Sequence, residues 1–143
     1  METTTKTKRY KSAKVNETFA EVARKTRNFV KNLRRDVVKF ANIQTDVNST
    51  QYEKRMALAE KVATQNVVTS VETILETSKT EDANTTNENI ANGVDSLILE
   101  LETTLANLTA TKNDKEASKY KRRRARGEET ATARVLDRVR KLQ

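Results

Sequence analysis

The sequence contains no cysteine, no histidine and no proline, and these absences exclude several kinds of chemistry. Without cysteine there is no disulfide framework, no thiol nucleophile and no sulfur ligand for zinc or an iron–sulfur cluster. Without histidine the commonest general base and metal ligand is missing as well. We therefore expect no enzyme activity, no metal site and no cofactor.

Turn-forming residues are scarce. The only glycines are Gly93 and Gly127, whereas a protein of many short strands would need glycine or proline at its turns. A loop that cradles phosphate needs clustered glycines, so a Walker or dinucleotide motif is excluded. The scarcity predicts helices and gives no reason to expect a small-molecule substrate.

Long apolar runs are also lacking. No run is long enough to span a bilayer, and the N-terminal "METTTKTKRYKSAK" lacks the apolar core of a signal peptide. We expect a location inside a cell, in cytoplasm or nucleoid, or inside a virion. Neither secretion through a signal peptide nor membrane attachment is expected.

The length and composition indicate one domain with a thin core. The chain has 143 residues, of which 35% are hydrophobic and 34% are charged. Such a core is assembled from narrow apolar stripes on several elements. Part of the apolar surface is then left to be covered by other subunits or by a ligand.

The first apolar stripe predicts a long helix from Val15 to about Val47. Basic residues repeat with the same period about half a turn away from the stripe, which gives this helix one apolar and one cationic side. The stripe consists of Val15, Phe19, Val22, Phe29, Leu33, Val37, Phe40 and Val47, and the basic residues are Arg24, Arg27, Lys31 and Arg35. The three phenylalanines are expected in the core.

Two capping-box spacings predict the next helices. Thr50 with Glu53 predicts a helix from about residue 51 to 78, and Thr85 with Glu88 predicts another after the polar loop "KTEDANTTNE". The stripe of the earlier helix is Tyr52, Met56, Ala59, Ala63, Val67, Val71 and Ile74, and that of the later one is Ile90, Val94, Leu97, Leu101, Leu105 and Leu108.

A fourth helix is predicted to start near Asn113 and Glu116 and to reach the C-terminus. Its stripe is Ala117, Tyr120, Ala131, Val135, Val139 and Leu142. Gly127, which costs about 1 kcal/mol inside a helix relative to Ala, is where this helix would kink or restart. We see no repeat of the solenoid length of 20–50 residues.

Together these patterns predict an all-α fold, a bundle of about four long amphipathic helices over residues 15–143. Residues 1–14 would form a flexible basic N-terminal arm.

Charge is segregated along the chain. Residues 1–47 hold 12 Lys/Arg and 5 Asp/Glu, residues 48–112 hold 5 and 10, and residues 113–143 hold 11 and 5. The stretch "ASKYKRRRARGEE" at 117–129 concentrates six basic residues without an acid until Glu128. A solvated helix face usually mixes charges of both signs, so unrelieved positive charge favours a polyanion as the partner.

We expect the two basic terminal regions to contact the phosphate backbone of DNA or RNA. The candidate binding residues are Lys6, Lys8, Arg9, Tyr10, Lys11, Lys14, Arg24, Arg27, Lys31, Arg35, Lys119, Tyr120, Lys121, Arg122, Arg123, Arg124, Arg126 and Arg134. Tyr10 and Tyr120 are the two side chains that could stack on a base, although Tyr120 also fits the apolar stripe. Other interpretations of the arginine-rich segment are a solvated face, a docking site for an acidic protein, a localisation signal, or contact with an anionic membrane.

The function that fits best is a structural nucleic-acid-binding protein that packages or coats DNA or RNA without reading sequence. Such a protein would self-assemble into an oligomer or filament, as a coat or nucleoprotein subunit of a virus does. The alternative is a helical scaffold or adaptor that recruits partner helices and binds no nucleic acid.

Overall fold

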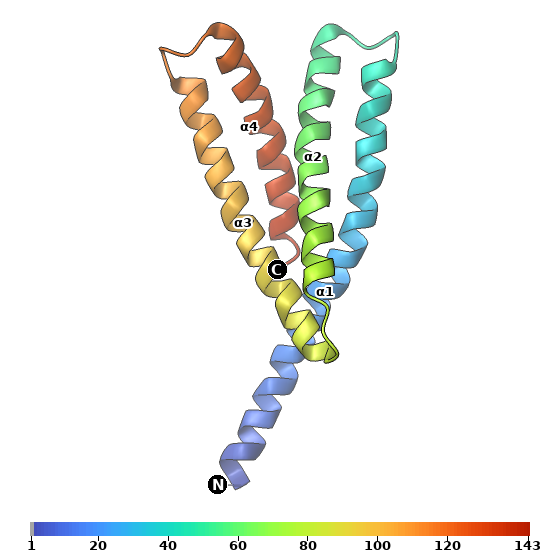
Figure 1. Ribbon diagram of the computed structural model, residues 1–143, viewed down its shortest axis with the longest axis vertical. Coiled ribbons are helices and arrows are strands. Elements are labelled where there is room, and N and C mark those ends of the chain that lie inside the picture. The colour runs from blue at the N-terminus through green and yellow to red at the C-terminus, as the bar shows by residue number, and fades with distance from the viewer. Residues whose placement is uncertain (1) are drawn as a thin grey trace.

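The computed structural model describes the backbone of residues 2–143 and the side chains of residues 13–143. The chain forms four helices, α1 (Glu2–Thr45), α2 (Gln51–Thr77), α3 (Ala83–Asn113) and α4 (Lys119–Arg140), with no strand in the described backbone. Figure 1 shows that they form two helical hairpins, α1–α2 and α3–α4. The predicted all-α bundle of four long helices is confirmed.

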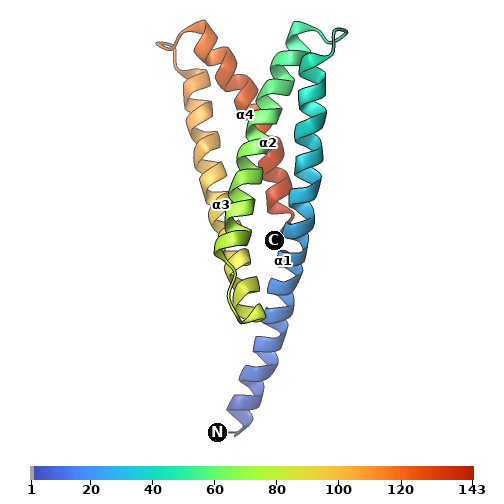
Figure 2. The same cartoon turned by 45° about the vertical axis from the view of Figure 1, so that its right-hand side comes forward.

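The two hairpins make a V. They converge near the α2–α3 connection and diverge towards the two tight turns at 46–50 and 114–118, as both views show (Figures 1 and 2). Each of α2 and α3 packs against both α1 and α4, whereas the backbones of α1 and α4 do not touch along the described chain. Helices α2 and α4 run side by side in the same direction, so their N-termini lie at the open end of the V.

The two hairpins align with each other at an offset of 68 residues, at which helix aligns with helix, turn with turn, and a minority of the residues are identical. The turns are built alike. The backbone N–H of Asn48 donates to Asp46 Oδ1 at 2.9 Å, and that of Glu116 donates to Asp114 Oδ1 at 2.9 Å. A repeat of this length was not recognised from the sequence, where only shorter periods were considered.

The buried positions of the two hairpins also correspond. Five pairs of identical residues on the inner faces of α2 and α4 are Ala57 and Ala125, Ala63 and Ala131, Thr64 and Thr132, Val67 and Val135, and Val71 and Val139. Nine of these ten side chains are buried, and Ala63 is partly buried. The same offset aligns α1 with α3, where Ala23 matches Ala91 and Leu33 matches Leu101. One packing scheme is thus used twice, which explains why both hairpins contribute to a single core.

The predicted stripes are confirmed in the middle of each helix and wrong at several ends. Leu33, Val67, Val71, Ile90, Val94 and Val139 are fully buried, and Phe29 is buried while Phe19 and Phe40 are partly buried. By contrast Val15 is 48% exposed, Val47 90%, Tyr52 68% and Tyr120 70%. Val47 lies in a turn and both tyrosines lie in first helical turns at the open end, where no opposite helix is close enough to cover them.

The helix starts differ in part from those predicted. The capping box at Thr50 is confirmed, since the Glu53 N–H donates to Thr50 Oγ1 at 3.1 Å and the Thr50 N–H to Glu53 Oε1 at 3.1 Å. The start at Thr85 is wrong because the Asp82 carboxylate caps α3 and accepts from the Thr85 N–H at 3.2 Å. The connection between α2 and α3 is therefore shorter than "KTEDANTTNE".

The start predicted at Asn113 and Glu116 is wrong as well, because Asp114 ends α3 and Ser118 caps α4. Helix α4 then continues through Gly127 without the restart that we expected. A Cβ added to Gly127 would face Ala59 Cβ at 3.8 Å and Met56 Sδ at 3.9 Å, so this glycine lies where α4 passes close to α2.

Segment 2–14 continues α1 as a helix rather than forming a separate flexible arm, and it projects beyond the bundle (Figure 1). It contains neither glycine nor proline, so nothing in its sequence interrupts helical hydrogen bonding. The candidate residues Lys6, Lys8, Arg9, Tyr10 and Lys11 fall outside the described side chains.

Candidate nucleic-acid interface

Six basic residues occupy the first two turns of α4. This α4 cluster consists of Lys119, Lys121, Arg122, Arg123, Arg124 and Arg126. The helix is fixed at its start by Ser118, whose Oγ accepts from the Lys121 N–H at 3.1 Å. All six side chains are exposed except Arg122, which is partly buried. The start of α4 is consequently a cationic, solvent-facing surface at the open end of the V.

This position is electrostatically unfavourable for cations. The positive end of the helix dipole lies at the N-terminus, where an acidic residue stabilises a helix and a basic one destabilises it by about 0.3–1 kcal/mol. The first turn of α4 contains no acidic residue. The positive charge therefore does not serve the stability of α4, and an anionic partner would relieve it.

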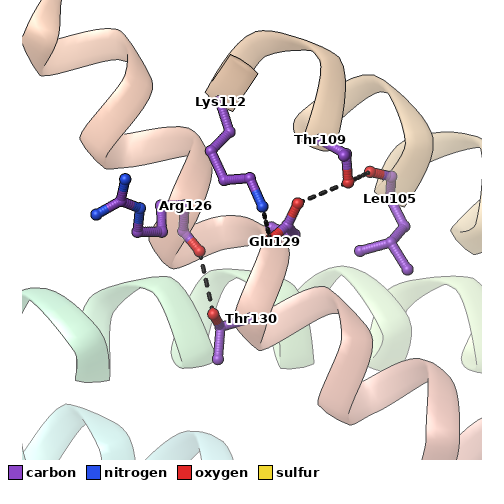
Figure 3. Close-up of polar contacts among 6 residues, drawn as sticks. All are labelled: Leu105, Thr109, Lys112, Arg126, Glu129 and Thr130. Carbon is purple, nitrogen blue, oxygen red and sulfur yellow. Dashed lines mark hydrogen bonds and ion pairs between the residues drawn. The ribbon is translucent and has the colours of Figure 1, made fainter.

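The two acids that follow the cluster already have partners. Glu128 accepts from Arg124 Nε at 2.9 Å. Glu129 accepts from Thr109 Oγ1 at 2.6 Å and from Lys112 Nζ at 2.9 Å, both on α3 (Figure 3). These contacts, the Thr109 hydrogen bond first, hold the pKa of Glu129 below its ordinary value. The Arg126 guanidinium points away from this carboxylate in Figure 3.

The other cations of the α4 cluster have no hydrogen-bonded partner, although the charge of Arg126 helps to lower the pKa of Glu129. Lys119, Lys121, Arg123 and Arg126 form no side-chain hydrogen bond or ion pair with any described residue. The Arg122 Nε is buried and has no hydrogen-bond partner. Five of the six basic side chains thus have no hydrogen-bonded or ion-paired partner among the described residues, and four of these five are exposed.

The first hairpin provides an internal comparison. At the positions of Lys119, Lys121, Arg124 and Arg126, α2 has Gln51, Glu53, Met56 and Leu58. Yet α2 also begins with a hydroxyl N-cap, which Glu53 completes to a capping box, and it buries the equivalent residues. Four of the six cations are therefore dispensable for building this helix start.

The predicted residues of α1 lie on a different surface. Arg24, Arg27, Lys31 and Arg35 form an exposed row on the outside of the helix, which we call the α1 ridge. It lies half a turn from the buried Phe29 and Leu33, and Arg24 pairs with Glu21 through Nη2 and Oε1 at 2.5 Å. The backbones of α1 and α4 do not come close to each other along the described chain, so the ridge and the α4 cluster lie on separate helices. Lys14 is exposed further towards the N-terminus of the same helix.

In the second half of α4, Arg134 and Arg138 form ion pairs with residues of other helices. Arg134 forms an ion pair with Glu60 of α2, whose side chain is almost fully buried. Arg138 pairs with Asp36 and lies over the Phe29 ring, 5.6 Å from its centroid. These contacts join the hairpins, so Arg134 lies in an interhelical bridge rather than among the available cations.

Tyr52 and Arg55 are not among the binding residues that were predicted from the sequence, in which Tyr52 was assigned to the apolar stripe of α2. Both residues are exposed at the start of α2, at the positions that correspond to Tyr120 and Arg123. The alignment of the two hairpins is the signal that would have identified them.

Within the described side chains no group of three Asp or Glu residues could hold a metal ion. None of the helices, over the residues searched, combines the length and the hydropathy needed to cross a bilayer. Comparison of the chain with protein-family models, with curated proteins and with solved structures gives no match.

Proposed function

We propose that this protein binds nucleic acid through contacts between the α4 cluster and backbone phosphates, as a structural protein that packages or coats DNA or RNA. The observation that carries the proposal is the set of five basic side chains at the start of α4 that have no hydrogen-bonded or ion-paired partner among the described residues. The equivalent start of α2 folds with four fewer cations, so their presence requires an explanation outside the fold.

Phosphate contacts fit the shape of this surface. Residues 119–126 rise about 10 Å along the helix axis, and their side chains emerge on several sides of the helix. A phosphate chain that crosses the start of α4 can therefore meet several guanidinium and ammonium groups. Contacts of this kind position a protein on the polymer without reading its sequence.

Assembly into a larger particle is part of this proposal. The cationic α1 ridge faces outward, while exposed acids such as Glu72, Glu76 and Glu100 lie on α2 and α3. Oppositely charged faces on one molecule favour contacts between copies. A coat or nucleoprotein subunit, viral or cellular, would use the α4 cluster for the polymer and these faces for its neighbours.

A helical adaptor that recruits partner helices is the second candidate. Leu58 and Val62 are one turn apart on α2 and are 47% and 46% exposed, which is a small apolar surface of the kind a partner helix covers. Such an adaptor would bind helical peptides and would show no affinity for nucleic acid.

The test compares two variants that lose the same charge. The cluster variant carries Lys119→Gln, Lys121→Gln, Arg123→Gln and Arg126→Gln. The matched ridge variant carries Arg27→Gln, Lys31→Gln and Arg35→Gln together with Lys39→Gln, an exposed residue one helical turn beyond the ridge. All eight residues are exposed, so both variants should keep the helical far-ultraviolet spectrum.

Affinity for a fluorescent oligonucleotide is measured at about 0.1 M salt. Each lost phosphate contact removes roughly 0.6–0.9 log units of affinity at this salt, so the cluster variant should lose at least about a hundredfold. The ridge variant should lose much less. An equal loss in both variants would assign binding to net charge, and unchanged binding in the cluster variant would refute the proposed site.

A further inference from the structure

The two described tyrosines are exposed while the phenylalanines are packed. Tyr52 is 68% and Tyr120 70% exposed, whereas Phe29 is buried and Phe19 and Phe40 are partly buried. Each tyrosine is the second residue of its helix, and the two correspond in the aligned hairpins. Large apolar rings left in water at matching places indicate a role outside the core.

The packing of α2 against α4 places both tyrosines towards the same space. Gly127 marks the close approach, since an added Cβ would lie 3.8 Å from Ala59 Cβ. Tyr120 lies two helical turns before Gly127, and Tyr52 two turns before Ala59, so each tyrosine occupies the face that its helix turns to the other. The helices diverge towards these ends (Figure 1), which leaves the rings uncovered.

The surroundings of the two rings are strongly cationic. An arginine follows each tyrosine by three residues, Arg55 on α2 and Arg123 on α4, and both are exposed. The α4 cluster begins beside Tyr120. In addition, α2 and α4 direct the positive ends of their helix dipoles to the same end of the molecule.

We propose that Tyr52 and Tyr120 form a stacking site for unpaired bases, and that the ligand of the α4 cluster is a single-stranded nucleic acid. This inference rests on the proposed function, which it makes more specific. Cations alone account for binding to any phosphate polymer but give no role to two exposed rings. A duplex keeps its bases stacked and covered, whereas a single strand offers base faces for stacking next to its phosphates.

The comparison of the two hairpins supports a role for the rings. Around the tyrosines, the exposed residues differ between the two hairpins. In the alignment, Gln51 corresponds to Lys119, Glu53 to Lys121 and Leu58 to Arg126. The tyrosine and the arginine three residues later are the same in both. Because all four side chains are exposed, burial in the core does not explain their identity.

Tyrosine fluorescence reports on this site in a Tyr10→Phe background, because the chain has three tyrosines and no tryptophan. The full-length protein is titrated with oligo(dT) of about 20 nucleotides, with a duplex of the same length, and with inorganic polyphosphate of similar charge. We expect the tightest binding to oligo(dT) at equal salt, with quenching of the emission. Polyphosphate should bind without quenching, since it has no bases.

Two double variants distinguish the effect of losing the aromatic rings from an effect of unfolding. Tyr52→Leu with Tyr120→Leu should weaken binding to oligo(dT) by about 10- to 100-fold and leave polyphosphate binding unchanged. Tyr52→Phe with Tyr120→Phe keeps both rings and should retain the affinity for oligo(dT). The helical spectrum of each variant confirms that it is folded.

The possible outcomes are distinct. Unchanged oligo(dT) affinity in the leucine variant, no quenching by oligo(dT), or a duplex affinity that equals that for oligo(dT) would each overturn the stacking site while leaving the phosphate contacts intact. If none of the three polymers binds to the wild-type protein, the proposed function fails together with this inference.

Discussion

The two glycines of the chain lie in contrasting surroundings, so replacing each by alanine should have opposite effects on stability. At Gly127 an added Cβ would make ordinary contacts with Ala59 Cβ at 3.8 Å and Met56 Sδ at 3.9 Å. Alanine is about 1 kcal/mol more favourable than glycine inside a helix. Gly127→Ala should therefore raise the free energy of unfolding by about 1 kcal/mol.

At Gly93 an added Cβ would lie 2.6 Å from Cγ2 and 3.1 Å from Cγ1 of Ile74. Both atoms are attached to the Cβ of a stiff, branched side chain, so relief requires α2 and α3 to move apart. Overpacking of this kind costs about 1–3 kcal/mol, which exceeds the gain in helix propensity. Gly93→Ala should lower the free energy of unfolding by about 1 kcal/mol.

Thermal and urea unfolding followed by far-ultraviolet circular dichroism measure both effects. A change of 1 kcal/mol should move Tm by about 2–5 °C in a chain of this size. Ala106→Gly, at an exposed position of α3, is the matched control and should lower stability by about 1 kcal/mol. A destabilised Gly127→Ala variant or a stabilised Gly93→Ala variant would show that these helices do not approach each other as described.

Three further substitutions test the core and the ion pairs. Leu97→Ala should cost about 2–5 kcal/mol and Leu101→Ala less, because Leu97 is buried and Leu101 partly exposed; equal urea midpoints would contradict this. Glu129→Gln should reduce the free energy of unfolding at pH 7 and much less near pH 3. The lowered pKa of Glu129 stabilises the fold above the unfolded-state pKa of about 4.3, and this stabilisation is lost as the pH falls. An equal effect at pH 7 and pH 3 would refute the contacts of Glu129 with Lys112 and Thr109. Arg134→Gln should cost about 1–2 kcal/mol, because it leaves the buried Glu60 carboxylate without its partner, yet oligonucleotide binding should not change.

Helical periodicity was sufficient to predict the number of helices and most of the core. The stripe from Ile90 to Leu101 and the cap at Thr50 are confirmed because both depend on residues within one or two turns of each other. Local patterns of this kind are recorded directly in the sequence.

Two features could not be predicted in this way: which of two neighbouring residues forms an N-cap, and which residues of different helices pack together. Asp82 and Thr85 both suit an N-cap, and the carboxylate forms the cap while the Thr85 hydroxyl donates to it at 2.6 Å. Tyr52 fits an apolar stripe, but its exposure follows from the divergence of the hairpins. The partner of Arg134 is Glu60 on another helix, which only the folded arrangement identifies.

Salt dependence is the most direct test of whether the α4 cluster binds phosphate. The affinity for oligo(dT) is measured between about 0.05 and 0.4 M salt for the wild-type protein, the cluster variant and Arg134→Gln. At about 0.7 per phosphate contact on a single strand, the five unpaired cations predict a slope of log affinity against log salt of about −3.5. The cluster variant should have a slope nearer −1, and Arg134→Gln should keep that of the wild type. A cluster variant with the wild-type slope would contradict phosphate binding at the start of α4.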